Sequence, residues 1–191
     1  EIAQKHSLKI ISIDDLVAYR LKNERLVRRE VSVKMPTKFG EFEVIAYTQL
    51  TTGDTHLVFK KGDWAPDEPV LVRVHSSTET GDILGMLLED YGSSINRALW
   101  QISEAGKGVF VYMRHAEQGN LLARLKKYRL QQEAGENATI EVNSPMNQRD
   151  FGTGAQILRD LDISKIRLIT NHPRRRVGLI GYSLEIVENV E

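Results

Sequence analysis

Four polar segments of the chain carry side chains that suit the binding of phosphate. The first runs from Arg73 through His75 to Ser77 and follows an apolar run, as at the end of a buried strand. An arginine supplies a planar fork of hydrogen-bond donors, and serine hydroxyls and backbone N–H groups add more. This segment predicts a phosphate cradle, and the alternative is a solvated strand end.

The other three segments also lie next to predicted strands or helices. Arg149 and Asp150 precede a predicted helix, where the arginine can meet an anion or the aspartate can cap the helix. Arg175 belongs to three arginines that follow Thr170, and they form either a phosphate site or an exposed basic turn. Residues 114–118 form a polar loop between a strand and a helix, where ligand contacts are common.

Histidine and cysteine usage gives no metal-binding motif. The five histidines are scattered without an i, i+4 pair, and the chain has no cysteine. Disulfides, thiolate nucleophiles and thiolate–zinc sites are therefore excluded. What remains is a set of polar loops at the carboxyl ends of strands, where folds of this kind bind ligands.

Composition and charge restrict the class of partner. The 191 residues carry a formal net charge of zero, so no bulk field draws the chain to nucleic acid or a membrane. We find no signal peptide and no apolar run near the roughly 18 residues of a membrane span. We therefore expect a cytoplasmic protein without a nucleic-acid or membrane partner. Since the sequence opens on Glu1 and reads as mid-protein, we also expect a piece of a longer polypeptide.

Hydrophobic periodicity predicts the elements that position these residues. Residues 1–30 read as an amphipathic tail, and from Val31 the pattern changes to the alternation of strands, with a turn at Gly40. The sequence predicts an α+β (α/β-type) domain with a mixed β-sheet flanked by helices. Further strands are predicted at residues 69–76, 108–113, 165–170 and within 177–190, and helices at 83–102 (broken near Gly92), 121–135 and 151–163.

Five motifs, in this order and spacing, resemble GTP cyclohydrolase II, the enzyme that opens riboflavin synthesis by cutting GTP. They are RVHS, TGD, RDF, RLITNHP and GYSLEIVENV. The resemblance implies that residues 31–191 form one cyclohydrolase-like domain. Residues 1–30 are similar to the tail of dihydroxybutanone-phosphate synthase, which is often fused ahead of the cyclohydrolase. The resemblance thus implies an upstream synthase domain, GTP or another phosphate ligand, and a homodimer.

The resemblance also assigns roles to individual residues. The arginine of the RDF motif, Arg149, matches the family nucleophile towards the α-phosphate. The positions matched to nucleotide binding are Arg73, Val74, His75, Ser76, Ser77, Glu117, Gln118, Tyr128, Thr139, Thr170 and Arg175.

This sequence departs from the family pattern at the metal site. The family holds zinc, beside magnesium, through three cysteines, and here those positions are Thr78, Glu89 and Tyr91. Neither threonine nor tyrosine is a common zinc ligand, and one carboxylate does not replace three thiolates. Because the zinc-bound water attacks the guanine ring, we expect no cofactor and no activated nucleophile for ring opening.

Three further departures fall on the same site. The family general-base aspartate is replaced by Asn147, whose amide is not a useful base. The loop that carries a phosphate-binding arginine reads Ala116-Glu117-Gln118, and a base-reading glutamine is Ser94. Together these losses predict that selection for the family reaction has relaxed.

The leading hypothesis is a degenerate cyclohydrolase II-like domain with a structural, dimerising or regulatory role and retained phosphate binding. One alternative is an active enzyme that releases pyrophosphate through Arg149. Another is a different metal, magnesium or manganese, held by Glu79, Asp82 or Glu89 with His75. The last is a domain without any ligand.

Overall fold

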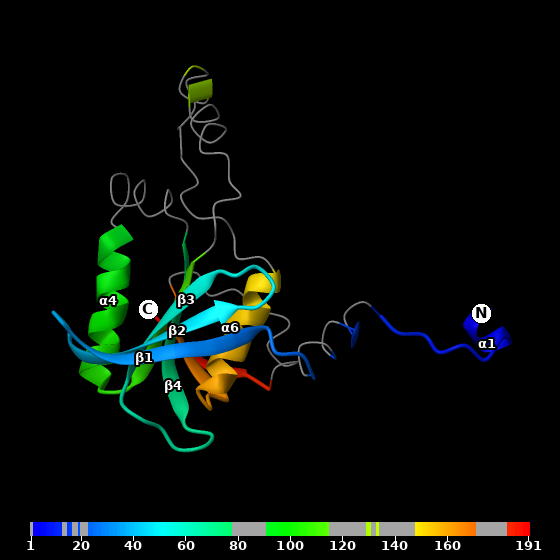
Figure 1. The fold of residues 1–191 in the computed structure, drawn as a ribbon, viewed down its shortest axis with the longest axis horizontal. Helices are drawn as coiled ribbons and strands as arrows, with labels where there is room; N and C mark the ends of the chain where they lie inside the picture. The colour runs from blue at the N-terminus through cyan, green and yellow to red at the C-terminus, as the bar shows by residue number, and fades with distance from the viewer. Residues whose placement is uncertain are drawn as a thin grey trace.

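The computed structural model describes residues 2–12, 15–16, 19, 23–77, 91–114, 129–130, 133, 148–170 and 183–191. In that part of the chain, seven strands form one mixed sheet in the order β1-β2-β3-β5-β4-β6-β7, with two long helices beside it (Figure 1). The predicted fold class is confirmed. The strands are β1 (Val27–Thr37), β2 (Gly40–Gln49), β3 (Thr55–Lys61), β4 (Pro69–Ser77), β5 (Gly108–Arg114), β6 (Lys165–Ile169) and β7 (Glu185–Val190), and the helices are α1 (Ile2–Lys5), α4 (Tyr91–Ala105) and α6 (Gln148–Asp160).

The first three strands form an antiparallel meander. Thr37 pairs with Gly40, so a two-residue loop joins β1 to β2, and the turn predicted at Gly40 is confirmed. β1 nevertheless begins at Val27, before the Val31 at which the alternation of strands was predicted to start. The reason is a bulge between Arg29 and Val31, which interrupts the period of two that the sequence pattern relied on.

The other four strands are parallel and come in the order β5-β4-β6-β7. β3 joins them through an antiparallel pairing with β5, and β4 pairs in parallel with both β5 and β6. The chain passes from β4 to β5 through α4, and from β5 to β6 through α6. The second connection therefore crosses over β4, which makes β4 the centre of the parallel half.

The two long helices cover opposite faces of the sheet. Ala98 and Ile102 of α4 pack with Leu71, Phe110 and their neighbours on one face. On the other face, α6 packs against the strand residues that alternate with those of the first core. This second core includes, from the strands, Val70, Val72, Val109 and Val111, and from the helix, Ala155, Ile157 and Leu158. Because successive strand side chains point to opposite faces, the two cores are separate layers.

Two elements differ from the predicted boundaries. α6 begins at Gln148, so Asp150 lies inside its first turn, and the predicted cap role of Asp150 is wrong. A carboxylate in the first turn still interacts favourably with the positive end of the helix dipole. α4 runs from Tyr91, while residues 83–90 and most of the helix predicted at 121–135 lie outside the described residues.

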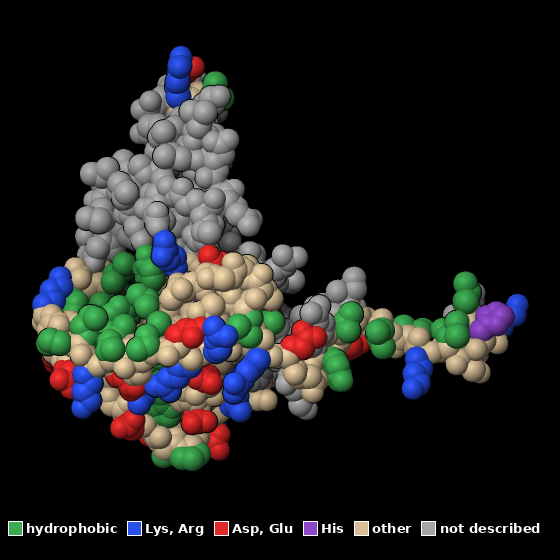
Figure 2. All heavy atoms as spheres, viewed as in Figure 1, with side chains coloured by type: hydrophobic (Ala, Val, Ile, Leu, Met, Phe, Trp, Pro, Cys, Tyr) green, Lys and Arg blue, Asp and Glu red, His purple; other side chains and the backbone are tan. Residues whose placement is uncertain are grey.

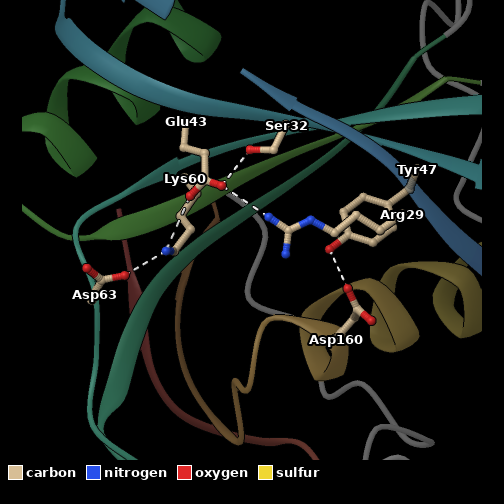
Figure 3. Close-up of polar contacts among 7 residues, drawn as sticks. All are labelled: Arg29, Ser32, Glu43, Tyr47, Lys60, Asp63 and Asp160. Atoms are coloured by element: carbon tan, nitrogen blue, oxygen red, sulfur yellow. Dashed lines mark hydrogen bonds and ion pairs between the residues drawn. The ribbon is translucent and has the colours of Figure 1, made fainter. Parts of the chain in front are cut away.

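Polar contacts fasten the edge of the sheet to α6 and to the neighbouring strands (Figure 3). The buried hydroxyl of Tyr47 on β2 donates to Asp160 at the end of α6, at 2.7 Å. On the same face, the Glu43 carboxylate accepts from Ser32 at 2.5 Å and pairs with Arg29 and Lys60. These contacts join β1, β2 and β3 side by side. No helix in the described part of the chain is long and apolar enough to cross a membrane.

Candidate functional site

The described backbone places some of the predicted site positions at one edge of the sheet. Parallel strands end at the same edge, so the carboxyl ends of β4, β5 and β6 lie together, and Ser77 pairs with Arg114 there. The helices run back down the sheet in such crossovers, so α4 and α6 begin at this edge too. The start of α6 therefore brings Arg149 to the edge, and the start of α4 brings Tyr91.

The edge contains the topological switch point of the sheet. The connections from β4 to β5 and from β5 to β6 lie on opposite faces, and the strand order reverses between β4 and β6. Open α/β sheets bind ligands in the crevice at such a point. Here the pairing of β4 with β6 stops at Val72 and Leu168, while β4 continues beside β5 as far as Ser77. β4 and β6 therefore separate at Arg73.

Arg73 bridges this switch point. Its guanidinium Nη1 donates to the main-chain oxygen of Ile169, the last residue of β6, at 3.0 Å, and the side chain is half-buried. It lies on the face that α4 covers, since it alternates with Val72 of the opposite core. The arginine therefore holds the ends of β4 and β6 at a fixed separation.

His75 lies on the same face in an aromatic stack. Its ring is nearly parallel to the ring of Tyr112, at 5.7 Å between centroids, and to that of Phe110, at 6.0 Å. Only 6% of the residue is exposed. The stack fixes the ring of His75 against β5, which steadies the end of β4.

The remaining described residues of the RVHS segment point the other way. Val74 packs against the core under α6, and the half-buried Ser76 shares that face by alternation. The motif thus divides its side chains between the two faces.

Thr170 lies at the same edge of the sheet, directly after β6. The residue is 5% exposed, and its backbone N–H donates to the oxygen of Val190 at 2.8 Å. It therefore ties the end of β6 to β7, immediately before the segment that contains Arg175.

Sequence reasoning missed one buried residue at this edge, His56 on β3. Its Nδ1 accepts a hydrogen bond from the backbone N–H of Arg114, at 3.2 Å, so the ring is neutral and protonated on Nε2. Nε2 then donates to the side-chain oxygen of Gln49 at 3.0 Å. His56 thus ties Arg114, the last described residue of β5, to β3. Nothing in the alternating pattern of β3 marks this histidine as special.

Several predicted site residues cannot be placed with the others. Arg149, Ser77 and Tyr91 are described by their backbone alone. The following lie outside the described residues: Thr78, Glu79, Asp82, Glu89, Glu117, Gln118, Tyr128, Thr139, Asn147 and Arg175. Within the described ranges, no three histidine, aspartate or glutamate side chains gather as a metal site would require.

Comparison with known proteins adds to this geometry. A family model for GTP cyclohydrolase II matches residues 28–191. The match starts one residue after the first residue of β1, Val27. Riboflavin biosynthesis protein RibBA of Cytophaga hutchinsonii is 52% identical over 193 residues, and RibBA of Bacillus cytotoxicus is 46% identical over 195 residues. These alignments cover all of this chain but 48% and 49% of the relatives, so the chain spans about half their length.

One solved structure is similar over the whole chain. It is RibBX from A. baumannii, described as a two-domain 3,4-dihydroxy-2-butanone 4-phosphate synthase. The TM-score is 0.60 at 26% sequence identity, and the match covers 100% of this chain and 48% of RibBX.

Proposed function

This chain belongs to the GTP cyclohydrolase II family, and from that premise we propose that it is a family member that no longer opens the GTP ring. In this proposal the domain keeps the family fold and a phosphate-binding edge, and it serves a riboflavin-pathway protein in a structural, dimerising or regulatory role. The proposal also keeps the protein in the cytoplasm, without a nucleic-acid partner.

The observation that carries the proposal is the donor set at the family zinc positions. The chain contains no cysteine, and Thr78, Glu89 and Tyr91 stand where the resemblance places three thiols. Zinc sites are built from thiolate, imidazole and carboxylate, so this set offers a single suitable ligand. The residues present therefore do not fit zinc.

The phosphate side of the site supports retained binding. Arg73 lies at the switch point between β4 and β6, and Thr170 directly follows the last residue of β6. Arg149 lies in the first turn of α6, whose amino end favours anions. These three positions, together with Arg175, favour GTP or another phosphate as the ligand.

The relatives support a fused partner. RibBA proteins are about twice as long as this chain, and RibBX, which matches over the whole chain, is named for the synthase reaction alone. We therefore propose an upstream dihydroxybutanone-phosphate synthase domain, to which this domain is attached without its own ring-opening reaction.

A turnover assay tests the loss of activity. The purified protein is incubated with GTP, Mg²⁺ and Zn²⁺, and formate and the pyrimidine product are measured beside a family member that keeps the three cysteines. We expect no formate above the protein-free background. Formate release at a rate near that of the cysteine-containing enzyme would contradict the proposal.

A second candidate function is release of pyrophosphate from GTP without ring opening. It is favoured by the position of Arg149 at the edge where Arg73 and Thr170 lie. In that reaction a guanidine nitrogen of Arg149 loses a proton to water and bonds to the α-phosphorus, while the bond from that phosphorus to the bridging oxygen breaks and pyrophosphate leaves. Water then cleaves the P–N bond and releases GMP. Pyrophosphate formation without formate, lost in Arg149→Lys, supports this version. A metal held by His75 with Glu79, Asp82 or Glu89 has less support, because the His75 ring is stacked and buried.

Calorimetry separates binding from a domain without a ligand. GTP, GMP and pyrophosphate are titrated into the protein and into the Arg149→Met variant. We expect GTP and pyrophosphate to bind the unmodified protein, and the variant to bind them at least several-fold more weakly. Absence of heat with all three ligands would leave the domain a purely structural role.

A further inference from the structure

Residues 24–26, which lead into β1 and are called the joint below, are held by one side chain of α6. The amide oxygen of Gln156 accepts from the backbone N–H of Leu26 at 2.7 Å, and the amide nitrogen donates to the oxygen of Glu24 at 2.8 Å. The oxygen of Leu26 also accepts from the N–H of Leu50, directly after β2, at 2.8 Å. Gln156 and the turn after β2 therefore fix the backbone through which the chain enters the sheet.

The joint does not have the composition of a flexible linker. Boundaries between domains usually fall in exposed segments rich in proline, glycine or small polar residues, which few contacts cross. Residues 23–26 read Asn-Glu-Arg-Leu, and the partly buried Leu26 packs against the core under α6. The joint is thus anchored both by its backbone and by a side chain.

Helical residues with a defined start precede the joint. Ser12 Oγ accepts from the N–H of Asp15 at 3.0 Å, and the Asp15 carboxylate accepts from the N–H of Ser12 at 3.1 Å, which is the reciprocal pair of a capping box. The described residues 15, 16, 19 and 23 are helical, and Asn23 Nδ2 donates to the oxygen of Tyr19 at 2.7 Å. Regular structure therefore reaches the residue directly before the joint.

Apolar side chains before the joint are exposed in the described part of the chain. This segment leaves the body beside α6 in Figure 1, and Figure 2 shows its hydrophobic side chains standing out along a narrow arm. Those that keep between 47% and 80% of their surface are Ile2, Leu8, Ile10, Ile11, Leu16 and Tyr19. Exposed apolar surface of this kind marks contact with another folded unit. The relatives are about twice as long as this chain, and the proposed synthase domain, called the preceding half below, is the unit that fits.

We propose that Gln156 makes residues 24–26 a fixed joint, which holds the preceding half in one orientation relative to the sheet. This inference rests on the fused synthase domain proposed above, and it adds that the two halves turn as one body. Arg149 and Gln156 are seven residues apart on α6, about 10 Å at 1.5 Å each, so the joint also has a fixed position relative to the candidate phosphate edge. Gln156 acts through the backbone of the joint and is therefore a positioning residue.

The absence of cysteine from the chain allows spin labels at chosen positions. Tyr19→Cys, at a 67% exposed position before the joint, and Val187→Cys, at a 44% exposed position on β7, carry the labels. Pulsed electron paramagnetic resonance then gives the distribution of distances between them. We expect one narrow distribution with Gln156 in place. Gln156→Met keeps the length of the side chain without its hydrogen bonds, and the distribution should become about two-fold wider, because the joint gains the freedom of an ordinary linker.

Gln101→Met is the matched control, because Gln101 of α4 also donates to a backbone oxygen, that of Glu191 at 2.7 Å, away from the joint. It should leave the width unchanged. A second label pair, Val31→Cys with Val187→Cys on the two outer strands, checks that the sheet of Gln156→Met is intact. Equal widths with and without Gln156, or a distribution that is already broad in the unmodified chain, would overturn the proposal.

The preceding half is tested separately in the full-length polypeptide. Ile10→Cys, at an 80% exposed position, should react with iodoacetamide about ten-fold more slowly there than in this chain, because a covered thiol reacts only when the structure opens locally. Val187→Cys sets the reference rate in both proteins. Equal rates for Ile10→Cys would remove the proposed fused partner, whereas slow alkylation with a distance distribution that Gln156→Met leaves unchanged would overturn the role of Gln156 alone.

Discussion

At the scale of the residue, Tyr47 shows how one buried hydroxyl fastens two layers. Its ring is fully buried, and its hydroxyl donates to Asp160 at 2.7 Å (Figure 3). We expect Tyr47→Phe to lower the free energy of unfolding by about 1 kcal/mol, the usual net value of such a hydrogen bond. Urea denaturation measures this, with Tyr19→Phe, at a 67% exposed side chain, as the control.

Tyr47 also makes the free energy of unfolding depend on pH in the alkaline range. Burial, reinforced by Asp160, raises the pKa of Tyr47 above its ordinary value of 10.0. Below pH 10 the tyrosine is neutral in both states, and its contribution to stability is complete. As pH rises further, only the unfolded state releases the proton, so stability falls. The advantage of the unmodified protein over Tyr47→Phe should therefore shrink above pH 10, and a constant difference up to pH 11 would contradict the assignment.

At the scale of the element, two glycines with similar backbone angles make different demands. Gly62 follows β3 with φ of +67°, and a Cβ there would lie 2.5 Å from the oxygen of Gly106. Gly106 follows α4 with φ of +70°, and its Cβ would meet no atom within 4 Å. We expect Gly106→Ala to cost about 1–2 kcal/mol for the left-handed conformation alone.

Gly62→Ala should cost clearly more, because backbone must also move. Thermal unfolding of the two variants, compared with the unmodified protein, measures the difference. Equal losses would show that the β3 turn and the end of α4 separate easily.

The elements also show what the sequence could predict. Alternation between Val31 and Gln49 predicted the first hairpin, and the apolar run at 108–113 predicted β5, because both patterns record local burial. The bond from Arg73 to Ile169 spans 96 residues and depends on the strand order, which periodicity does not encode. His56 was not predicted from the sequence for the same reason, since its partner Arg114 belongs to another strand. The motif residues were found by resemblance, and the face that each one occupies was not.

At the scale of the whole molecule, restoring the thiols should restore metal binding without restoring chemistry. The triple variant Thr78→Cys, Glu89→Cys and Tyr91→Cys returns three soft ligands to the family positions. We expect it to bind about one equivalent of zinc, measured by atomic emission after dialysis, and to release no formate from GTP. Asn147 still stands at the general-base position, so proton transfer remains impaired.

A matched double variant, which keeps Tyr91, should hold zinc more weakly. If the triple variant binds no zinc, the three positions are not brought together, and the divergence extends to the scaffold. If it releases formate, Asn147 is not a barrier to turnover, and the proposed cause of inactivity reduces to the metal alone.

The central place of β4 also has a consequence for how the polypeptide acquires its structure. The meander of β1, β2 and β3 joins neighbours along the chain, so it can assemble from contacts between successive segments. β6 reaches β4 only after both crossovers, across a separation of 96 residues, and contacts of such high order form slowly. We therefore expect β6 to pair with β4 late during synthesis. Until then, one edge of β4 is unpaired in the nascent chain.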